Sequence, residues 1–172
     1  MQRKSFSEMP CPIAQALDTV GEAWCLLILR ELFLGFRRFQ ELEQRLGITA
    51  STLTRRLNEL TRRGLVAARV YAQRPTRSEY VLTPMGEDLF PVILALGAWG
   101  NRWLTRAIVP VDPHTESPLE PVLVDQQSRR ELTLGTVALA AGPDAPKLLR
   151  QQLAVPRLLR GTPNAVECEV AP

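Results

Sequence analysis

The sequence predicts a mainly α-helical fold with one small β hairpin, and three observations lead to this class. Apolar side chains recur at helical spacing in several segments of the first 103 residues. Glycines interrupt or end most of these segments, as they commonly do at helix ends. Two short runs rich in β-forming residues, 65–71 and 78–82, flank a polar turn, which is the pattern of a hairpin.

The first part of the chain predicts three helices after a polar N-terminal arm, residues 1–10. Pro12 opens a short helix that Gly21 interrupts. The next segment, 24–35, is apolar nearly all round, which is typical of a helix at the centre of a core. A third helix over 40–46 completes this part.

The next predicted helix lies between Thr49 and Gly64. The Thr49 hydroxyl can cap its first turn, and Gly64 suits the left-handed position that follows many helices. Leu53, Leu57 and Leu60 recur at helical spacing and define one apolar stripe. The opposite face offers hydroxyls, an amide and guanidinium groups. A solvent-exposed amphipathic helix is the alternative interpretation, and the neighbouring segments argue against it.

Two strands are expected directly after this helix, Leu65–Tyr71 and Ser78–Leu82. The turn between them, residues 72–77, carries Arg74 and Arg77. Two helices joined by a short glycine-containing turn and followed by a hairpin form a winged helix-turn-helix domain. The sequence therefore predicts this domain over residues 11–107.

A last helix of the domain is expected to begin at Thr83 and Pro84, which favour a helix N-terminus. Its apolar residues recur at alternating intervals of four and three as far as Trp103, and Pro91 is expected to bend it. Packing in the core of the same chain is one explanation for this apolar face. We favour contact with a second subunit, because the earlier leucines already supply a core.

A proline-rich connector, residues 108–121, marks a boundary in the sequence. Beyond it we expect strands at 122–124 and 132–140, then a brief helix at 147–153. The predicted organisation is thus an arm (1–10), the winged helix-turn-helix domain (11–107) and a C-terminal α+β extension (108–172).

Arginines concentrate in the helix-turn-helix and hairpin segments, which predicts a polyanionic partner. Between residues 37 and 77 there are ten arginines and three glutamates. The residues expected to contact bases in the major groove of DNA are Ser51, Thr52, Arg55 and Arg56. Those expected to contact the DNA backbone, from the helix pair or the wing, are Arg37, Arg38, Arg74 and Arg77. Arg62 and Arg63 are expected to cap their own helix, and Arg45 and Arg69 to be surface charges.

Several classes of function are disfavoured by what the sequence lacks. The sequence has no nucleophile paired with a base, no recognisable carboxylate-pair motif and no phosphate loop. We therefore expect no enzyme, no catalytic residue and no cofactor. His114 is the single histidine, and Cys11, Cys25 and Cys168 are widely scattered, which predicts neither a metal site nor a disulfide framework. No apolar run is long enough to span a bilayer, so we expect a cytoplasmic protein with no membrane partner.

Many separate motifs resemble the HxlR-type winged-helix regulators. They include Cys11-Pro-Ile, Gly21-Glu-Ala-Trp24, Leu53-Thr-Arg-Arg-Leu57, Gly64-Leu-Val66 and Glu79-Tyr-Val-Leu-Thr83. The resemblance covers about residues 11–103 and implies a bacterial transcriptional regulator that acts as a homodimer through its first and last helices. The interface residues expected on this basis are Ile13, Leu17, Leu89, Val92, Leu96, Trp99 and Trp103. Many family members have Gly-Gly-Lys-Trp where this chain has Gly21-Glu-Ala-Trp24.

The same resemblance makes Cys11 a candidate redox sensor, because some family members use a cysteine near the first helix. A thiolate beside a helix start is also stabilised and reactive, although an inert cysteine is the commoner state. The combined prediction is a repressor or activator that binds an operator in double-stranded DNA and answers a small-molecule effector or an oxidant. The alternative is a winged-helix module that binds proteins without specific DNA recognition.

Overall fold

The computed structural model describes residues 5–73 and 76–159, with the backbone alone described for 71–73 and 76–77. The chain divides into two compact units, Met1–Glu120 and Pro121–Pro172. The predicted fold class is confirmed, since the first unit is mostly helical with one two-stranded antiparallel sheet. Its elements are α1 (Pro12–Val20), α2 (Ala23–Phe33), α3 (Phe39–Leu46), α4 (Ala50–Arg62), β1 (Val66–Gln73), β2 (Thr76–Leu82), α5 (Pro84–Glu87) and α6 (Phe90–Trp103).

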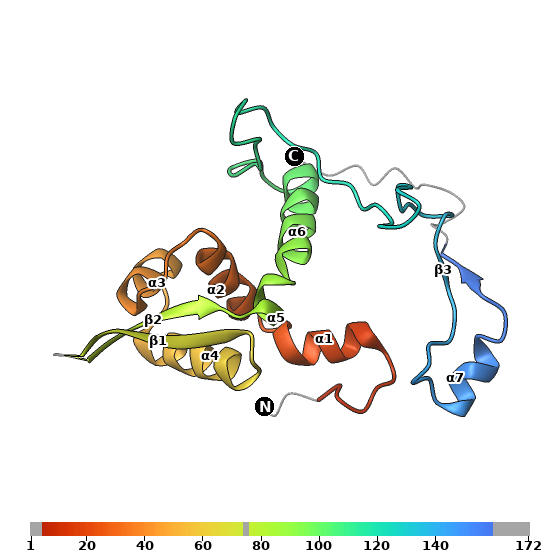
Figure 1. Ribbon diagram of the computed structural model, residues 1–172, viewed down its shortest axis with the longest axis horizontal. Helices are drawn as coiled ribbons and strands as arrows, with labels where there is room; N and C mark the ends of the chain where they lie inside the picture. Colours follow the sequence, from red (N-terminus) through yellow and green to blue (C-terminus); the bar gives the residue numbers. More distant parts are fainter. Residues whose placement is uncertain (1–4, 74–75, 160–172) are drawn as a thin grey trace. The chain divides into compact units, whose positions relative to one another are not determined.

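The core of the first unit lies between α2, α3, α4 and the base of the hairpin (Figure 1). Ile28 and Leu29 of α2 are completely buried, which confirms the central place predicted for this apolar helix. Leu53, Leu57 and Leu60 of α4 are also 0% exposed, so the predicted leucine stripe anchors α4 to the core. Burying each such side chain stabilises the fold by about 1.5–3 kcal/mol.

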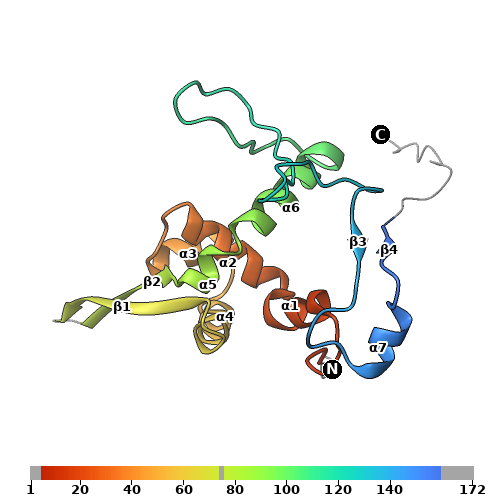
Figure 2. The ribbon, with the colours of Figure 1, turned by 45° about the vertical axis from the view of Figure 1, so that its right-hand side comes forward.

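The ends of α4 follow the local rules that the sequence predicts. The Thr49 hydroxyl accepts a hydrogen bond from the backbone N–H of Thr52 at 3.3 Å, which satisfies one unpaired donor of the first turn. Gly64 has a φ of +76°, the left-handed conformation that favours glycine. The short connection from Gly47 to Thr49 brings α3 and α4 together as a helix-turn-helix pair (Figure 2).

The strands of the hairpin are longer than predicted. They pair antiparallel from Val66 opposite Leu82 outward, with an irregularity between Val70 and Ala72. The hairpin is attached to the segment before α3, because the Tyr80 N–H donates to the carbonyl of Arg37 at 2.8 Å. This bond places the arginines that precede α3 beside the base of the wing.

The last helix of the domain differs from the prediction of one bent helix ending at Trp103. It consists of α5 and α6, which are separated at Asp88 and Leu89. Pro91 lies in the first turn of α6, where its missing N–H costs little. Its ring would clash with the carbonyl of Glu87 in a continuous helix, which explains a break rather than a bend.

The second unit contains β3 (Ala138–Leu139), α7 (Lys147–Gln152) and β4 (Arg157–Leu158). The helix lies within the range 147–153 expected from the sequence, and β3 lies within the expected strand 132–140, but β4 lies outside both expected strands. β3 pairs with β4, whereas 122–124 contributes only one bridge, between Val124 and Glu131. The Asp125 carboxylate accepts bonds from the Ser128 N–H and hydroxyl, and this tight turn joins the two bridged segments. Among residues 121–159, all of which are described, none is buried.

Candidate nucleic-acid interface

The first turn of α4 presents a cluster of hydroxyl groups to solvent. The Thr49 hydroxyl lies 3.1 Å from that of Ser51 and donates to that of Thr52 at 3.0 Å. Ser51 is exposed and Thr52 is half-buried at the edge of the same face. The cap that begins the helix therefore also orients two of the side chains predicted to contact bases.

Arg55 lies one turn further along this face and is exposed. Within residues 5–73 and 76–159, the Arg55 side chain forms no ion pair or hydrogen bond. A guanidinium in this state keeps all of its donors for an external partner, and it can bind guanine or phosphate with two parallel bonds.

Arg56 differs from the other members of the predicted base-contacting set in its surroundings. Its side chain is only 13% exposed, and its Nη2 donates to the Glu22 carboxylate at 2.6 Å. The position is 100° further round the helix than Arg55, which turns it from the outer face toward the start of α2. Arg56 therefore joins α4 to α2 instead of extending outward with Ser51 and Arg55.

Arg62 and Arg63 are both bound to Glu59 on the same helix, at 2.7 and 2.6 Å. Hydrogen bonds from Arg62 and then Arg63 lower the pKa of Glu59 to about 2. Arg63 also approaches the Asp18 carboxylate of α1, at 3.6 Å. These contacts go beyond the capping role that the sequence predicts, because they connect α4 to α1.

The four arginines predicted to contact the DNA backbone lie in two places. Arg37 and Arg38 are exposed at the entry to α3, where the Arg38 N–H donates to the Glu41 carboxylate at 3.0 Å. Arg74 lies outside the described residues, as does the side chain of Arg77. The role of all four in contacting phosphate stays a prediction.

Glu31 is a structural residue that sequence reasoning missed. It is 1% exposed, and its carboxylate accepts bonds from Arg45 Nε at 2.5 Å and Arg30 Nε at 2.9 Å. Burial alone would raise the pKa of Glu31, but the hydrogen bonds from Arg45 and Arg30 outweigh burial and lower it. The signal in the sequence that could have indicated this role is a glutamate inside a segment that is otherwise almost entirely apolar. Arg45, predicted to be a surface charge, instead connects α3 to α2 and stacks on Phe36, 3.6 Å from the ring centroid.

Arg69, the other arginine predicted to be a surface charge, binds across the hairpin. Its Nε donates to the Glu79 carboxylate at 2.8 Å, while its side chain remains 62% exposed. The pair therefore occupies the surface of the wing, where an ion pair contributes at most about 1 kcal/mol.

The cysteines occupy different environments. Cys11 is half-buried at the N-cap of α1 and carries a free thiol. Cys25 is 1% exposed and belongs to the core. Cys168 lies outside the described residues. No group of three or more histidine, cysteine or acidic residues within 5–73 and 76–159 has the arrangement of a metal site.

Most of the predicted subunit interface is an open apolar surface on α1 and α6. In the part of the chain that the structure describes, α6 has no buried residue. The exposed members of the predicted set are Ile13, Leu17, Val92, Leu96, Trp99 and Trp103, between 47% and 71% exposed. Leu89 differs, because it packs against the core of its own chain.

Comparison with known proteins agrees with this geometry. Residues 19–108 match the model of the HxlR-like helix-turn-helix family, a match that covers more than half of the chain. The chain belongs to the HxlR-like helix-turn-helix family. An uncharacterized HTH-type transcriptional regulator of Mycobacterium tuberculosis is 41% identical over 135 residues, which cover 76% of this chain and 85% of that protein.

Solved structures extend the likeness of this HxlR-like protein beyond its DNA-binding domain. PA1374 from Pseudomonas aeruginosa, which is assigned as a transcription factor, is 39% identical with a TM-score of 0.62; the match covers 83% of this chain and all of that one. The redox regulator HypR, in its oxidized form, is 35% identical with a TM-score of 0.50, over 54% of this chain and 96% of that one.

These relatives establish the general class of the HxlR-like chain. It is a transcriptional regulator with a DNA-binding helix-turn-helix, and the family and the relatives named above are regulators rather than enzymes. No single helix within residues 5–73 and 76–159 combines the length and apolar character needed to cross a bilayer; α1 and α2 do so only as a pair, bent by 77°.

Proposed function

We propose that this protein binds a specific operator in double-stranded DNA through the outer face of α4. One observation carries the proposal: Ser51 and Arg55 are exposed, while the leucines on the opposite face are completely buried. In helix-turn-helix proteins the second helix of the pair lies in the major groove, and its first turns reach base edges. Ser51, Thr52 and Arg55 are the residues to which we assign base contacts.

The phosphate contacts would come from both sides of α4. Arg37 and Arg38 precede the helix pair, and Arg74 and Arg77 belong to the wing. Contacts to phosphate fix the position of a protein on the duplex without reading its sequence. These four arginines therefore supply affinity, and the first turns of α4 supply specificity.

The active form would be a homodimer built from α1 and α6. Apolar side chains such as Leu96 and Trp99 are about half exposed, at 52% and 55%, and several large apolar side chains exposed on one helix are typical of an interaction site. A two-fold dimer presents two copies of α4. It would therefore bind two half-sites separated by about one helical turn of DNA, roughly 34–36 Å, or a multiple of it.

The signal that controls DNA binding would be a small molecule or an oxidant. The half-buried free thiol of Cys11 supports the oxidant, and the HypR relative is itself named a redox regulator. DNA binding measured before and after treatment with diamide tests this role. A loss of affinity that Cys11→Ser abolishes supports it, and an unchanged response in Cys11→Ser contradicts it.

Fluorescence anisotropy on labelled duplexes tests the proposed function. The DNA upstream of the protein's own gene is compared with a scrambled duplex of equal length and composition. Specific binding should exceed non-specific binding by about 10³-fold or more. The logarithm of affinity should fall with the logarithm of salt concentration by about 0.9 per phosphate neutralised. Equal affinity for both duplexes, at every salt concentration, would favour a protein-binding module.

A further inference from the structure

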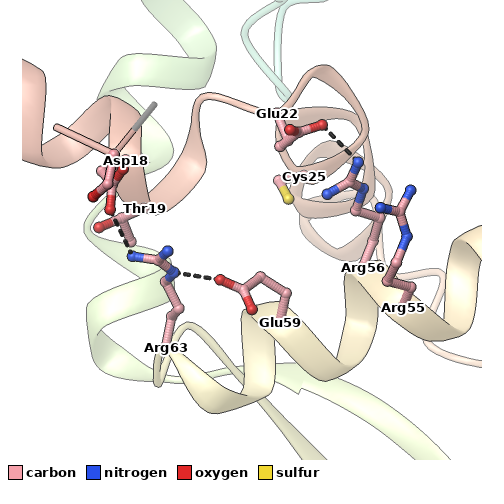
Figure 3. A pocket seen from close by; sticks show the side chains of 9 residues that line it. Asp18, Thr19, Glu22, Cys25, Arg55, Arg56, Glu59 and Arg63 are labelled. Carbon is pink, nitrogen blue, oxygen red and sulfur yellow. Dashed lines mark hydrogen bonds and ion pairs between the residues drawn. The ribbon is translucent and has the colours of Figure 1, made fainter. Parts of the chain in front are cut away.

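A cavity of about 380 Å³ lies between α1, the start of α2 and α4 (Figure 3). Its walls are mostly charged and polar: they include Asp18 and Thr19 of α1, Glu22 at the N-cap of α2, and Arg55 and Arg56 of α4, together with Cys25 of α2. Cavities that bind small molecules start at about 300 Å³. The cavity is thus large enough for a small organic ligand.

The carboxylates that line this cavity are already neutralised by arginines. Glu22 accepts a bond from Arg56 at 2.6 Å, and Glu59 accepts bonds from Arg62 and Arg63. Asp18 accepts the N–H of Phe6 at 3.0 Å and lies 3.6 Å from Arg63. The acids therefore offer no spare negative charge to a cationic ligand.

Hydrogen-bond donors, in contrast, remain in excess. The Arg55 guanidinium is exposed beside Arg56 (Figure 3) and forms no bond within the described part of the chain. The Nε–H of Arg56 is buried and also lacks an acceptor among the described residues. Arg56 therefore keeps donor capacity beyond its bond to Glu22, while the exposed donors of Arg55 are the ones that a ligand in the cavity reaches directly. Two adjacent guanidinium groups match a carboxylate in both charge and geometry.

We propose that this cavity binds a small polar organic acid, with its carboxylate group on Arg55 and Arg56 and its remaining polar groups against the charged and hydroxyl-bearing walls of the cavity. The inference rests on the proposed function, because Arg55 is also the arginine assigned to base recognition. An occupied cavity holds the Arg55 side chain against the helix flank and withdraws it from DNA. The ligand therefore releases the operator.

Isothermal titration calorimetry of the full chain without DNA tests the site. The probes are lactate and 3-hydroxybutyrate, with the neutral lactamide and 3-hydroxybutanamide as matched controls at constant ionic strength. At least one carboxylate should bind, and its amide should bind about tenfold more weakly or worse, because the charge-assisted bonds are lost. Equal affinity of acid and amide, or no binding of either acid at millimolar concentration, would overturn the site.

Two variants locate the binding in the chain. Arg55→Gln removes the free guanidinium and should weaken carboxylate binding by about tenfold. Arg69→Gln makes the same charge change on the hairpin, where Arg69 binds Glu79 and neither residue lines the cavity, so it should keep the affinity within about twofold. Equal weakening by both variants would show a general effect of charge and refute the site.

Anisotropy with operator DNA separates this proposal from the proposed function. The carboxylate should raise the apparent dissociation constant of the operator, by the factor expected from the carboxylate concentration and its own dissociation constant. By the same linkage, bound operator should weaken carboxylate binding. Operator binding without any carboxylate binding refutes the cavity and leaves the proposed function intact. Carboxylate binding that depends on Arg55, without specific DNA binding, refutes the proposed function alone. Binding of both without mutual weakening refutes the competition.

Discussion

Breaking the buried ion pair between Glu31 and Arg45 should destabilise the helix-turn-helix more than breaking a surface pair. Glu31 has a side chain 2% exposed and accepts a 2.5 Å bond from Arg45, which joins α2 to α3. Removing one partner of a fully buried pair costs about 3–5 kcal/mol. Arg45 is 42% exposed and Arg30 also binds Glu31, so we expect about 2 kcal/mol for Arg45→Met, below that range.

The double variant Glu31→Leu/Arg45→Met should restore most of this loss, because it removes the buried charge together with its partner. Urea unfolding followed by circular dichroism measures the change in the free energy of unfolding. Arg69→Met is the matched control, since Arg69 is 62% exposed and its pair with Glu79 should contribute less than about 1 kcal/mol. If Arg45→Met and Arg69→Met lose the same free energy, or if the double variant is the least stable, the reasoning about burial is refuted.

Three further predictions concern α4 and α6. Because the pKa of Glu59 is about 2 in the folded chain and ordinarily 4.5, its contribution to stability is complete above pH 4.5 and is lost as the pH falls toward 2. Glu59→Gln should therefore flatten the fall in the free energy of unfolding over this range, and a fall as steep as that of the natural chain contradicts the pairing. Thr49→Ala should lower the free energy of unfolding, measured in urea titrations, by about 1 kcal/mol, because it removes the N-cap of α4. An unchanged free energy of unfolding would show that this cap does not stabilise the helix. Leu96→Glu should keep the helical circular dichroism spectrum of the natural chain, because Leu96 is half exposed in the single chain, yet give a monomer in light scattering. A persistent dimer would exclude Leu96 of α6 from the interface.

The helix-turn-helix could be predicted from the sequence because its signals are local. The leucine stripe of α4, the Thr49 cap and the glycine after the helix act within one or two turns, and each favours the same helix. The hairpin follows from two β-forming runs around a polar turn. For the same reason, the outward direction of Ser51 and Arg55 follows from helical periodicity alone.

What could not be predicted depends on contacts between distant segments. Arg55 and Arg56 are adjacent and chemically identical, and only the approach of Glu22 from α2 separates a free guanidinium from a paired one. The pairing of Arg45 with Glu31 spans 14 residues and has no periodic signature. In the second unit, β3 pairs with β4 across an intervening helix, and two-residue strands carry too little pattern to predict a partner.

The central claim is that the exposed side chains of α4 read the base sequence of an operator. The most direct test is the ratio of operator affinity to scrambled-DNA affinity, measured by anisotropy at one salt concentration for the natural chain, Arg55→Ala and Arg37→Ala. Arg55→Ala should lower this ratio by about 5- to 150-fold, the equivalent of one bidentate contact worth about 1–3 kcal/mol. Arg37→Ala should weaken both affinities alike and leave the ratio unchanged. An unchanged ratio in Arg55→Ala would contradict the assignment of base recognition to this face.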